Sequence, residues 1–376
     1  MNESKKIVYV DFHAPETYRE NGRHIFAILN PFIIEGFQVY ISKNVQHQLE
    51  KLHGNSITDW PPPARLMISL SGLKVVDSLS LDFKGGIYIF DKKDKKLIGH
   101  PWHKWLQVKF DIFSPYRFSK PILLPYNVHP MNAKRVVGES LNSLRIARRN
   151  VRILFAGDLE GYKRRWISFP KEKLSRLNVI STIKERLDSP LLQANSPEEL
   201  NTILESVYSK NLVIIDNDES RVAWEQWMDV IAHADFFLCP PGIVMPMCHN
   251  IIEAMAIGTI PLTNYPEWLS PKLDHLKNCV VFDNEDDLIE KINMVLAMSD
   301  EKITEMRENA IKYYEENLKP ETFVRKVESH TERKLEILMY SEYNVAKKTK
   351  KFNARSVLSR GEEAVGNWAW LSRAWR

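Results

Sequence analysis

The sequence has no run of 18 apolar residues, so it predicts no membrane-spanning helix. It also has no apolar signal-peptide core, because the charged lead MNESKK passes directly into the short apolar run IVYV. We therefore expect the protein in the cytoplasm. Of the 376 residues, 44% are hydrophobic and 27% are charged. This composition excludes a disordered chain, and the length allows two domains with separate cores.

Cysteine is scarce, and its pattern indicates neither a disulfide framework nor a metal site. The three residues Cys239, Cys248 and Cys279 cannot all pair with one another. Their spacing matches no zinc-binding pattern, so we expect reduced thiols. The sequence also has no internal repeat, and no low-complexity tract except the C-terminal tail.

Short apolar runs alternate with amphipathic segments along the chain. This alternation predicts mostly parallel, doubly wound sheets. It starts again at residue 151, where a second apolar run follows a basic segment. We place a Rossmann-like domain at residues 1–149, a second one at 150–320, and a helix with a basic aromatic tail at 321–376. In the first domain the expected strands include residues 7–11, 37–41, 65–70 and 86–90.

The most informative stretch is residues 235–268. The apolar run FFLC is followed by two prolines and Gly242, which predicts a buried parallel strand that ends in a turn. Apolar residues then recur at helical spacing over residues 247–257, and a second short strand is expected at 259–262. Strand, loop, helix and strand form a βαβ unit.

The loop and the first helical turn of this unit carry the candidate chemistry. Ligands of open α/β sheets bind beyond the carboxyl ends of the strands, against helix N-termini whose N–H groups favour phosphate. Gly242 would let the backbone approach a ligand, and His249 and Asn250 lie in the first turn. Glu253, one turn further, could hold two sugar hydroxyls with its two carboxylate oxygens. Alternatively, the stretch is an ordinary buried βαβ unit with Glu253 on its solvated flank.

The stretch from residue 240 to 268, PPGIVMPMCHNIIEAMAIGTIPLTNYPEW, resembles the donor-binding region of GT-B glycosyltransferases. It is most similar to exostosin-like enzymes, and more distantly similar to the large retaining family whose motif ends in EAMA-x-G-x-P-V. The resemblance covers about residues 151–325 and is specific over the quoted stretch. It implies a GT-B fold, in which two Rossmann-like domains face a central cleft and a C-terminal helical tail follows.

The resemblance also implies roles for single residues. In these families the glutamate of EAMA holds the ribose of a nucleotide-sugar, and this role carries over to Glu253. The loop before it, which contains Gly242, His249 and Asn250, is implied to face the diphosphate and the sugar. The retaining family has another glutamate eight positions upstream, where this sequence has Met245. That departure favours an inverting enzyme.

Lys163, Arg164 and Arg165 form a second candidate site. They follow the first expected strand of the second domain, in a loop that also contains Gly157 and Gly161. Cations at the carboxyl end of a strand suit a diphosphate, and a fixed cation there would stabilise a departing nucleoside diphosphate. GT-B enzymes often carry an Arg or Lys in the equivalent loop. The alternative is a solvated basic turn.

His13 and Glu16 are the candidate catalytic residues. They lie in the loop after the first expected strand, and inverting enzymes of this fold often take their general base from loops of the N-terminal domain. His13 can accept a hydroxyl proton near neutral pH, and Glu16 can do so if it is partly desolvated. Alternatively, His13 is a surface histidine beside a helix N-terminus.

We expect no cofactor and no metal. The run Asp216-Asn217-Asp218 is interpreted as a turn and not as the metal-binding Asp-x-Asp motif of GT-A enzymes, because the surrounding sequence lacks other GT-A features. In a GT-B enzyme, helix ends and cations bind the diphosphate, and the nucleotide-sugar is a substrate.

The tail over residues 347–376 alternates Lys and Arg with apolar and Trp residues. Such a segment is typical of a helix that lies on a membrane surface. Alternatively, it packs back on the first domain, as C-terminal helices of GT-B folds commonly do. Nothing else in the sequence supports nucleic-acid binding.

Together these features predict a cytoplasmic, metal-independent glycosyltransferase, peripheral on the inner face of the membrane if the tail binds lipid. It would transfer a sugar from a nucleotide-diphosphate-sugar donor to a glycan or lipid-linked glycan hydroxyl, in surface polysaccharide or lipopolysaccharide biosynthesis. An inverting mechanism is preferred. Two alternatives stay open: another sugar-nucleotide enzyme of the same architecture, such as an epimerase, and a non-catalytic carbohydrate-binding scaffold.

Overall fold

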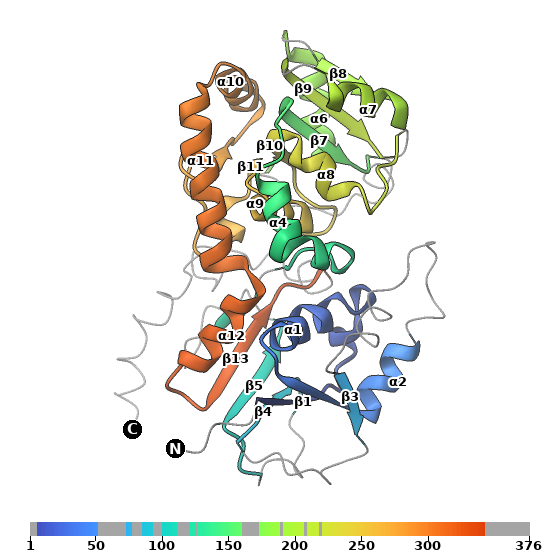
Figure 1. The fold of residues 1–376 in the computed structure, drawn as a ribbon, viewed down its shortest axis with the longest axis vertical. Helices are drawn as coiled ribbons and strands as arrows, with labels where there is room; N and C mark the ends of the chain where they lie inside the picture. The colour runs from blue at the N-terminus through green and yellow to red at the C-terminus, as the bar shows by residue number, and fades with distance from the viewer. Residues whose placement is uncertain are drawn as a thin grey trace. The chain divides into compact units, whose positions relative to one another are not determined.

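In the computed structural model the chain divides into two compact units, one of residues 1–130 and 319–376 (unit 1) and one of residues 131–318 (unit 2). Each unit has one parallel sheet with helices packed against it (Figure 1). The predicted α/β class with two Rossmann-like domains is thereby confirmed for each unit by itself. The residues that the structure describes are 6–51, 73–76, 85–92, 100–110, 121–124, 126–159, 173–188, 191–206, 209–217 and 220–342.

Unit 1 contains a seven-stranded sheet in the order β3-β2-β1-β4-β5-β13-β6, and all neighbours are parallel. Strand β1 lies inside it, with Val8 in register with Val39 of β2 on one side and Ile87 of β4 on the other. The chain builds β2 and β3 on one side of β1, and then β4 and β5 on the other. The strands are β1 (Ile7–Asp11), β2 (Gln38–Ser42), β3 (Leu73–Val76), β4 (Ile87–Phe90), β5 (Lys104–Lys109), β6 (Ile122–Leu124) and β13 (Lys334–Met339).

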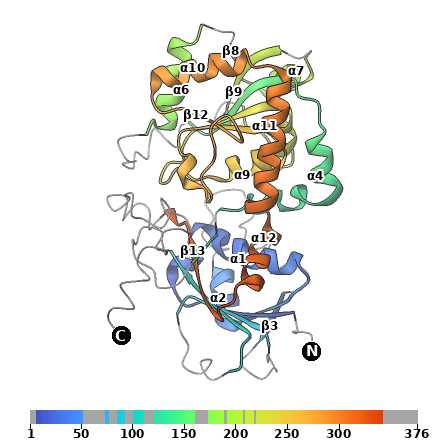
Figure 2. The same cartoon turned by 90° about the vertical axis from the view of Figure 1, so that its left-hand side faces the viewer.

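Helix α1 forms because its apolar residues recur at helical spacing, and nearly all of them are buried in unit 1. Near its end Phe32 packs edge-on against Phe37 and against Phe323 of α12, with ring centroids 5.3 and 5.8 Å apart. Figure 2 shows α12 beside α1, so residues from the last part of the chain complete this core. The helices of unit 1 are α1 (Arg23–Ile34), α2 (Lys43–Lys51) and α12 (Pro320–Ser329), with 3-10 turns at Pro15–Tyr18 and Glu20–Gly22.

Unit 2 contains a six-stranded sheet in the order β12-β11-β10-β7-β9-β8, again with parallel neighbours only. Its first strand, β7, lies between β9 and β10: Leu154 is in register with Val213 on one side and Phe237 on the other. The strands are β7 (Val151–Gly157), β8 (Leu191–Ala194), β9 (Ser209–Asp216), β10 (Ala234–Cys239), β11 (Ile260–Thr263) and β12 (Val280–Val281).

Alternate residues of these strands form the core of one face of the sheet, because side chains at i and i+2 point the same way. Ile153 and Phe155 of β7 and Phe236 and Leu238 of β10 pack there with apolar residues of α6, α10 and α11. Helices α8 and α9 contact each other and β10 (Figure 1). The helices of unit 2 are α4 (Gly138–Arg145), α6 (Arg176–Arg186), α7 (Pro197–Glu205), α8 (Trp227–Ala232), α9 (His249–Ala256), α10 (Glu285–Leu296) and α11 (Asp300–Tyr313).

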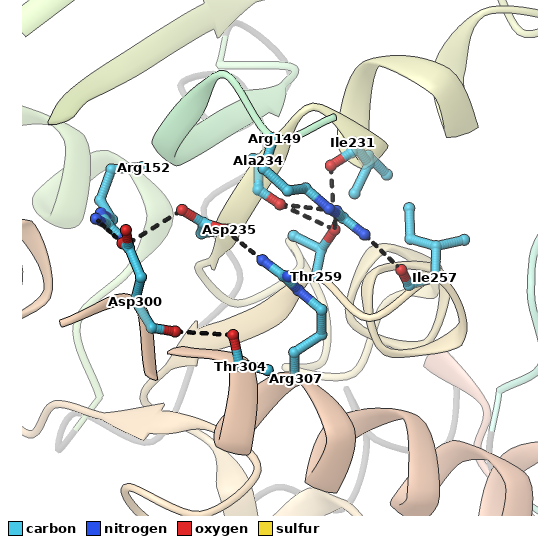
Figure 3. A network of polar contacts seen from close by, with 10 residues as sticks. All are labelled: Arg149, Arg152, Ile231, Ala234, Asp235, Ile257, Thr259, Asp300, Thr304 and Arg307. Atoms are coloured by element: carbon cyan, nitrogen blue, oxygen red, sulfur yellow. Dashed lines mark hydrogen bonds and ion pairs between the residues drawn. The ribbon is translucent and has the colours of Figure 1, made fainter. Parts of the chain in front are cut away.

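A buried charge network holds the amino ends of β7 and β10 (Figure 3). Asp235 accepts from Arg152 at 3.1 Å and also from Arg307 of α11. Arg152, which is fully buried, reaches Asp300 at 3.2 Å as well. Removing one partner of such a network would leave an uncompensated buried charge, which destabilises a protein by about 3–5 kcal/mol. The network lies at the edge of the sheet opposite to the one where ligands of open sheets bind.

The boundary between the units falls after Pro130, against the predicted position near residue 150. Side chains of the intervening segment explain the difference. Arg149 donates to the carbonyls of Ala234 and Ile257, at 2.8 and 2.7 Å, and Arg145 donates to Ala256 at 2.9 Å. These bonds fix residues 131–150 to unit 2.

The C-terminal segment was predicted as a helix followed by a tail, but the structure shows a helix followed by a strand. Helix α12 is present, but a strand follows it: β13 lies between β5 and β6 in the sheet of unit 1. Glu336 interrupts the apolar pattern of this strand, and its charge is paired with Lys109 of β5, which is distant in sequence. The predicted strand at 65–70 and the tail at 347–376 lie outside the described residues.

Candidate functional site

The strand order of unit 2 identifies the edge where a ligand is expected. The chain leaves β7 to build β8 and β9 on one side, and later builds β10, β11 and β12 on the other. The order therefore reverses between β7 and β10. Ligands of open α/β sheets bind beyond the carboxyl ends of the strands at such a point. The loops that follow β7 and β10 are the two that the sequence singled out.

The loop after β10 is closed on itself by backbone contacts. The N–H of Gly242 donates to the carbonyl of Pro246 at 3.2 Å. A Cβ atom at position 242 would lie 2.5 Å from the carbonyl oxygen of Met245, so no other residue fits without a shift of the loop. The structure thus gives a reason for Gly242 that differs from the predicted one. Glycine is needed at position 242 because the backbone of the loop itself, and not a ligand, lies close to this residue.

Helix α9 begins at His249, directly after this loop. The preceding residue, Cys248, has extended backbone geometry and makes no side-chain cap, so it does not satisfy the N–H groups of the first turn. His249 and Asn250 are half-buried in that turn. A helix N-terminus at the switch point of a sheet is suited to an anion, because its N–H groups and its dipole both favour negative charge.

Glu253 lies one turn into α9, and only 1% of it is exposed. One carboxylate oxygen accepts from Asn132 Nδ2 at 2.8 Å, and the other accepts from Trp227 Nε1 at 2.7 Å. The alternative interpretation, in which Glu253 lies on a solvated flank, is wrong. The two donors fix the plane of the carboxylate.

A buried cation at the same switch point was missed by the sequence analysis. Arg176, the first residue of α6, is 6% exposed. Its Nη1 donates to the carbonyl of Asp158 at 3.2 Å, and its guanidinium lies 5.8 Å from the ring centroid of Phe155. A Cβ atom at Gly157 would lie 3.0 Å from the same Nη1. Arg176 therefore lies directly against the carboxyl end of β7.

The position of Arg176 is unusual for a cation, because the dipole of a helix disfavours positive charge at its N-terminus. This disagreement between residue type and position was the available sequence signal. The predicted cations Lys163, Arg164 and Arg165 lie outside the described residues.

The thiols near this site are free, as predicted. Burial raises the pKa of Cys239 well above its usual range, and it raises the pKa of Cys279 to about 12. Both are therefore protonated at neutral pH. Cys248 is less buried, and its Sγ lies 3.7 Å from the hydroxyl of Tyr265.

Unit 1 has its own switch point at β1, which has β2 on one side and β4 on the other. The carboxyl ends of these three strands bring together residues that are far apart in sequence. Asp11 ends β1 and His13 follows it, Asn44 lies just beyond β2, and Asp91 lies just beyond β4. His13 Nε2 lies 2.8 Å from Asp11 Oδ2. Of the cluster, only His13 was predicted.

Unit 1 contains two further residues that could exchange a proton, Glu16 and His129. Glu16 is half-buried in the 3-10 turn Pro15–Tyr18 that follows His13. His129 is buried, and burial together with the charge of Arg23 lowers its pKa to about 3. His129 is therefore neutral at physiological pH.

The described residues include no group of three or more His, Cys, Asp or Glu placed to hold a metal ion. Within the same residues, no helix is both long and apolar enough to cross a bilayer. Asp216 ends β9 and the N–H of Asn217 donates to the carbonyl of Gly157 at 3.1 Å, while Asp218, the last residue of the predicted turn, lies outside the described residues.

No protein-family model matches the chain, and no curated protein matches it. Several solved structures are similar over most of its length, but at low identity. A glycosyltransferase from Rickettsia africae is 11% identical, with 85% of this chain and 96% of that one covered and a TM-score of 0.42. HepE from Anabaena, in complex with UDP and glucose, is 12% identical, with coverages of 86% and 99% and a TM-score of 0.38.

WaaG, a glycosyltransferase involved in lipopolysaccharide biosynthesis, is 14% identical, with coverages of 85% and 98% and a TM-score of 0.36. Of these three structures, the Rickettsia africae protein and WaaG are described as glycosyltransferases, and HepE holds UDP and glucose. At these TM-scores the similarity by itself assigns no activity to the chain, and the exostosin-like resemblance stays a prediction.

Proposed function

We propose that the protein is a glycosyltransferase that uses a nucleotide-diphosphate-sugar donor. The observation that carries this proposal is made at the switch point of unit 2, where β10 leads into an uncapped helix N-terminus, β7 ends against a buried cation, and a fixed carboxylate lies one turn into that helix. The first two suit a diphosphate and the third suits a ribose diol. The resemblance of residues 240–268 to GT-B donor sites supports the same assignment.

In this proposal the N–H groups at the start of α9 bind the diphosphate, together with His249 and Asn250. Arg176 and the predicted cations Lys163, Arg164 and Arg165 neutralise the charge that builds on the leaving diphosphate. Gly242 keeps the loop in the shape that presents these N–H groups. Glu253 accepts the ribose hydroxyls, while Asn132 and Trp227 hold it in place.

Unit 1 binds the acceptor, a glycan or lipid-linked glycan, and supplies the general base from His13 or Glu16. The reaction inverts the anomeric configuration, since Met245 occupies the position where the retaining family has its second glutamate. It needs no divalent metal and no cofactor. The biosynthetic context that we propose is surface polysaccharide or lipopolysaccharide, with the tail at 347–376 either on a membrane surface or on unit 1.

The first test is donor binding. The melting temperature of the full chain is measured with UDP-, GDP- and ADP-sugars, in buffer containing EDTA. One donor class is expected to raise it, because a ligand that binds only the folded state stabilises that state. Transfer to a glycan acceptor should then proceed in EDTA. Isomerisation of the donor without acceptor would instead show an epimerase, and binding of glycan without any nucleotide-sugar would show a carbohydrate-binding scaffold.

The variant Glu253→Gln tests the role of the carboxylate without emptying the site. A glutamine can accept from Trp227 with its oxygen and donate to Asn132 after rotation of the asparagine amide, so the fold is expected to persist. Loss of the charged acceptor should weaken donor binding by about tenfold or more, since hydrogen bonds to charged groups contribute about 1.5–3 kcal/mol. Glu308→Gln, on the exposed side of α11, is the control. Unchanged donor affinity in the Glu253 variant would contradict the proposal.

A further inference from the structure

The Asp11–His13 pair has a local structural cause. Asp11 is the last residue of β1, and side chains two positions apart in extended chain lie on the same side. The two side chains meet at 2.8 Å, between Asp11 Oδ2 and His13 Nε2. The side chain of Asp11 is 7% exposed, whereas that of His13 is 42% exposed. A buried carboxylate thus holds an imidazole that can reach a ligand.

The backbone that carries His13 is fixed from three directions. The N–H groups of His13 and Ala14 donate to the two carboxylate oxygens of Asp91, each at 2.8 Å. Asn44 Nδ2 donates to the carbonyl of Phe12 at 2.7 Å, and the hydroxyl of Tyr18 donates to the same oxygen at 2.7 Å. These bonds come from beyond β4, from α2 and from the following 3-10 turn. The imidazole is therefore held in place before any substrate binds.

We propose that Asp11 is the positioning residue of a catalytic base, His13, whose reactive atom is Nδ1. This inference rests on the proposed transferase function. An ionised carboxylate only accepts hydrogen bonds, so the contact with Asp11 places the ring proton on Nε2 and leaves the lone pair on Nδ1. Asn44 Nδ2 lies 3.5 Å from Nδ1, which is too long for a strong hydrogen bond, so a substrate hydroxyl can take its place.

In the proposed step, a proton moves to His13 and a glycosidic bond replaces the bond to the leaving diphosphate. The acceptor hydroxyl gives its proton to His13 Nδ1, while its oxygen forms a bond to the anomeric carbon of the donor. The bond between that carbon and the phosphate oxygen breaks, and its electron pair leaves with the nucleoside diphosphate. His13 becomes an imidazolium next to Asp11, and its exposed ring releases the proton to solvent.

Among the described residues, the titratable groups bonded to His13 or to the preceding Phe12 are Asp11, Asp91 and Tyr18. Burial, together with the charges of Asp91 and Asp11, raises the pKa of Tyr18, so it remains a neutral hydrogen-bond donor. The two carboxylates are negative, and a negative neighbour stabilises the imidazolium. Asp11→Asn removes one of these two charges.

Kinetics provide the first test. His13→Ala is expected to lower kcat by about a hundredfold or more, because general base catalysis contributes about 10²–10⁴-fold. Asp11→Asn should lower kcat by about tenfold or more, leave KM for the donor within twofold, and move the acid limb of the kcat–pH profile to lower pH. His47→Ala and Glu50→Gln, both exposed on α2, are the matched controls and should keep wild-type kcat. If Asp11→Asn keeps wild-type kcat and its pH profile, the proposal is overturned.

The ring tautomer provides a second test that does not need activity. In full-length protein labelled with ¹⁵N-histidine, the ring resonances of His13 are assigned through their loss in His13→Ala. The neutral wild-type ring should carry its proton on Nε2, and Asp11→Asn should produce a mixture of tautomers. A wild-type ring with its proton on Nδ1 would overturn the proposal.

The two hypotheses can fail separately. If sugar is transferred but kcat does not depend on His13 and Asp11, the base is wrong and the transferase assignment stands. If no nucleotide-sugar binds, the transferase assignment fails, whatever tautomer His13 adopts.

Discussion

Glu20 accepts hydrogen bonds from distant parts of unit 1. One carboxylate oxygen accepts from the hydroxyl of Tyr126, and the other accepts from the N–H of Glu342 at 2.7 Å and lies 3.2 Å from His24 Nε2. Burial alone would raise the pKa of Glu20. The hydrogen bonds and the charge of His24, with the bonds from Tyr126 and Glu342, outweigh burial and lower that pKa. One residue thus joins the segments before α1, after β6 and after β13.

The variant Glu20→Gln should destabilise unit 1 in a pH-dependent way. Because the pKa of Glu20 is lower in the folded state, its carboxylate stabilises the fold above the ordinary pKa of 4.5, and this contribution is lost as the pH falls through the folded-state pKa. At pH 7 the variant should lose about 1–3 kcal/mol of unfolding free energy, measured by urea denaturation. The difference from wild type should shrink in acid. Glu50→Gln is the control, and a difference that does not vary with pH would contradict this account.

At the scale of the element, α6 combines a favourable cap with an unfavourable charge. Ser175 caps the helix by accepting from the N–H of Asn178 at 3.2 Å, while Arg176 places a buried cation in the first turn. The dipole and the desolvation of Arg176 both oppose this arrangement in the absence of an anion. A bound diphosphate would reverse both effects.

The variant Arg176→Met should therefore affect stability and ligand binding differently. Losing the bond to the carbonyl of Asp158 is offset by the removal of a buried charge, so the free energy of unfolding should change by less than about 1 kcal/mol. Affinity for a nucleoside diphosphate, measured by calorimetry, should fall by about tenfold or more. Arg186→Met, on the same helix and paired with Asp286, is the control. Equal nucleotide affinity in both variants would rule out Arg176 as a phosphate ligand.

At the scale of the molecule, the chain crosses between the units twice, after Pro130 and after Leu318. Unit 2 is therefore one continuous segment with its own sheet and core. Unit 1 is made of two segments, and β13 from the second lies between β5 and β6. Without β13, the backbone N–H and C=O groups of β5 and β6 that pair with it would lose their hydrogen-bond partners.

Truncations test this division. A protein of residues 131–318 should fold alone and unfold cooperatively, because its strands pair only with one another. A protein of residues 1–318 should lose the folding transition of unit 1, whereas one of residues 1–342 should keep it. Thermal unfolding followed by circular dichroism measures both. Two transitions in the 1–318 protein would show that β13 is dispensable.

Local pattern was sufficient for much of the fold. Several elements could be predicted because the spacing of their apolar residues and the residues that end them lie within one short stretch of sequence. These are the strands β1, β7, β10 and β11 and the helices α1 and α9. The strands β3, β5, β8 and β13 were not predicted, and the strand expected near β3 was placed at residues 65–70 instead. In β13 a charged residue, Glu336, interrupts the apolar pattern, and its partner, Lys109, ends a strand that is distant in the chain.

The candidate sites, like the fold, could be predicted from the sequence only in part. The sequence alone determined that a strand, a turn at Gly242 and a helix with His249 and Asn250 in its first turn follow one another, since these residues are neighbours in the chain. Only the tertiary structure decided the rest. It buried Glu253 between Asn132 and Trp227, set Arg176 against β7, and gathered Asp11, His13, Asn44 and Asp91 at one edge. These contacts depend on which strands are neighbours, and long-range pairing in a parallel sheet is not encoded in any one stretch of residues.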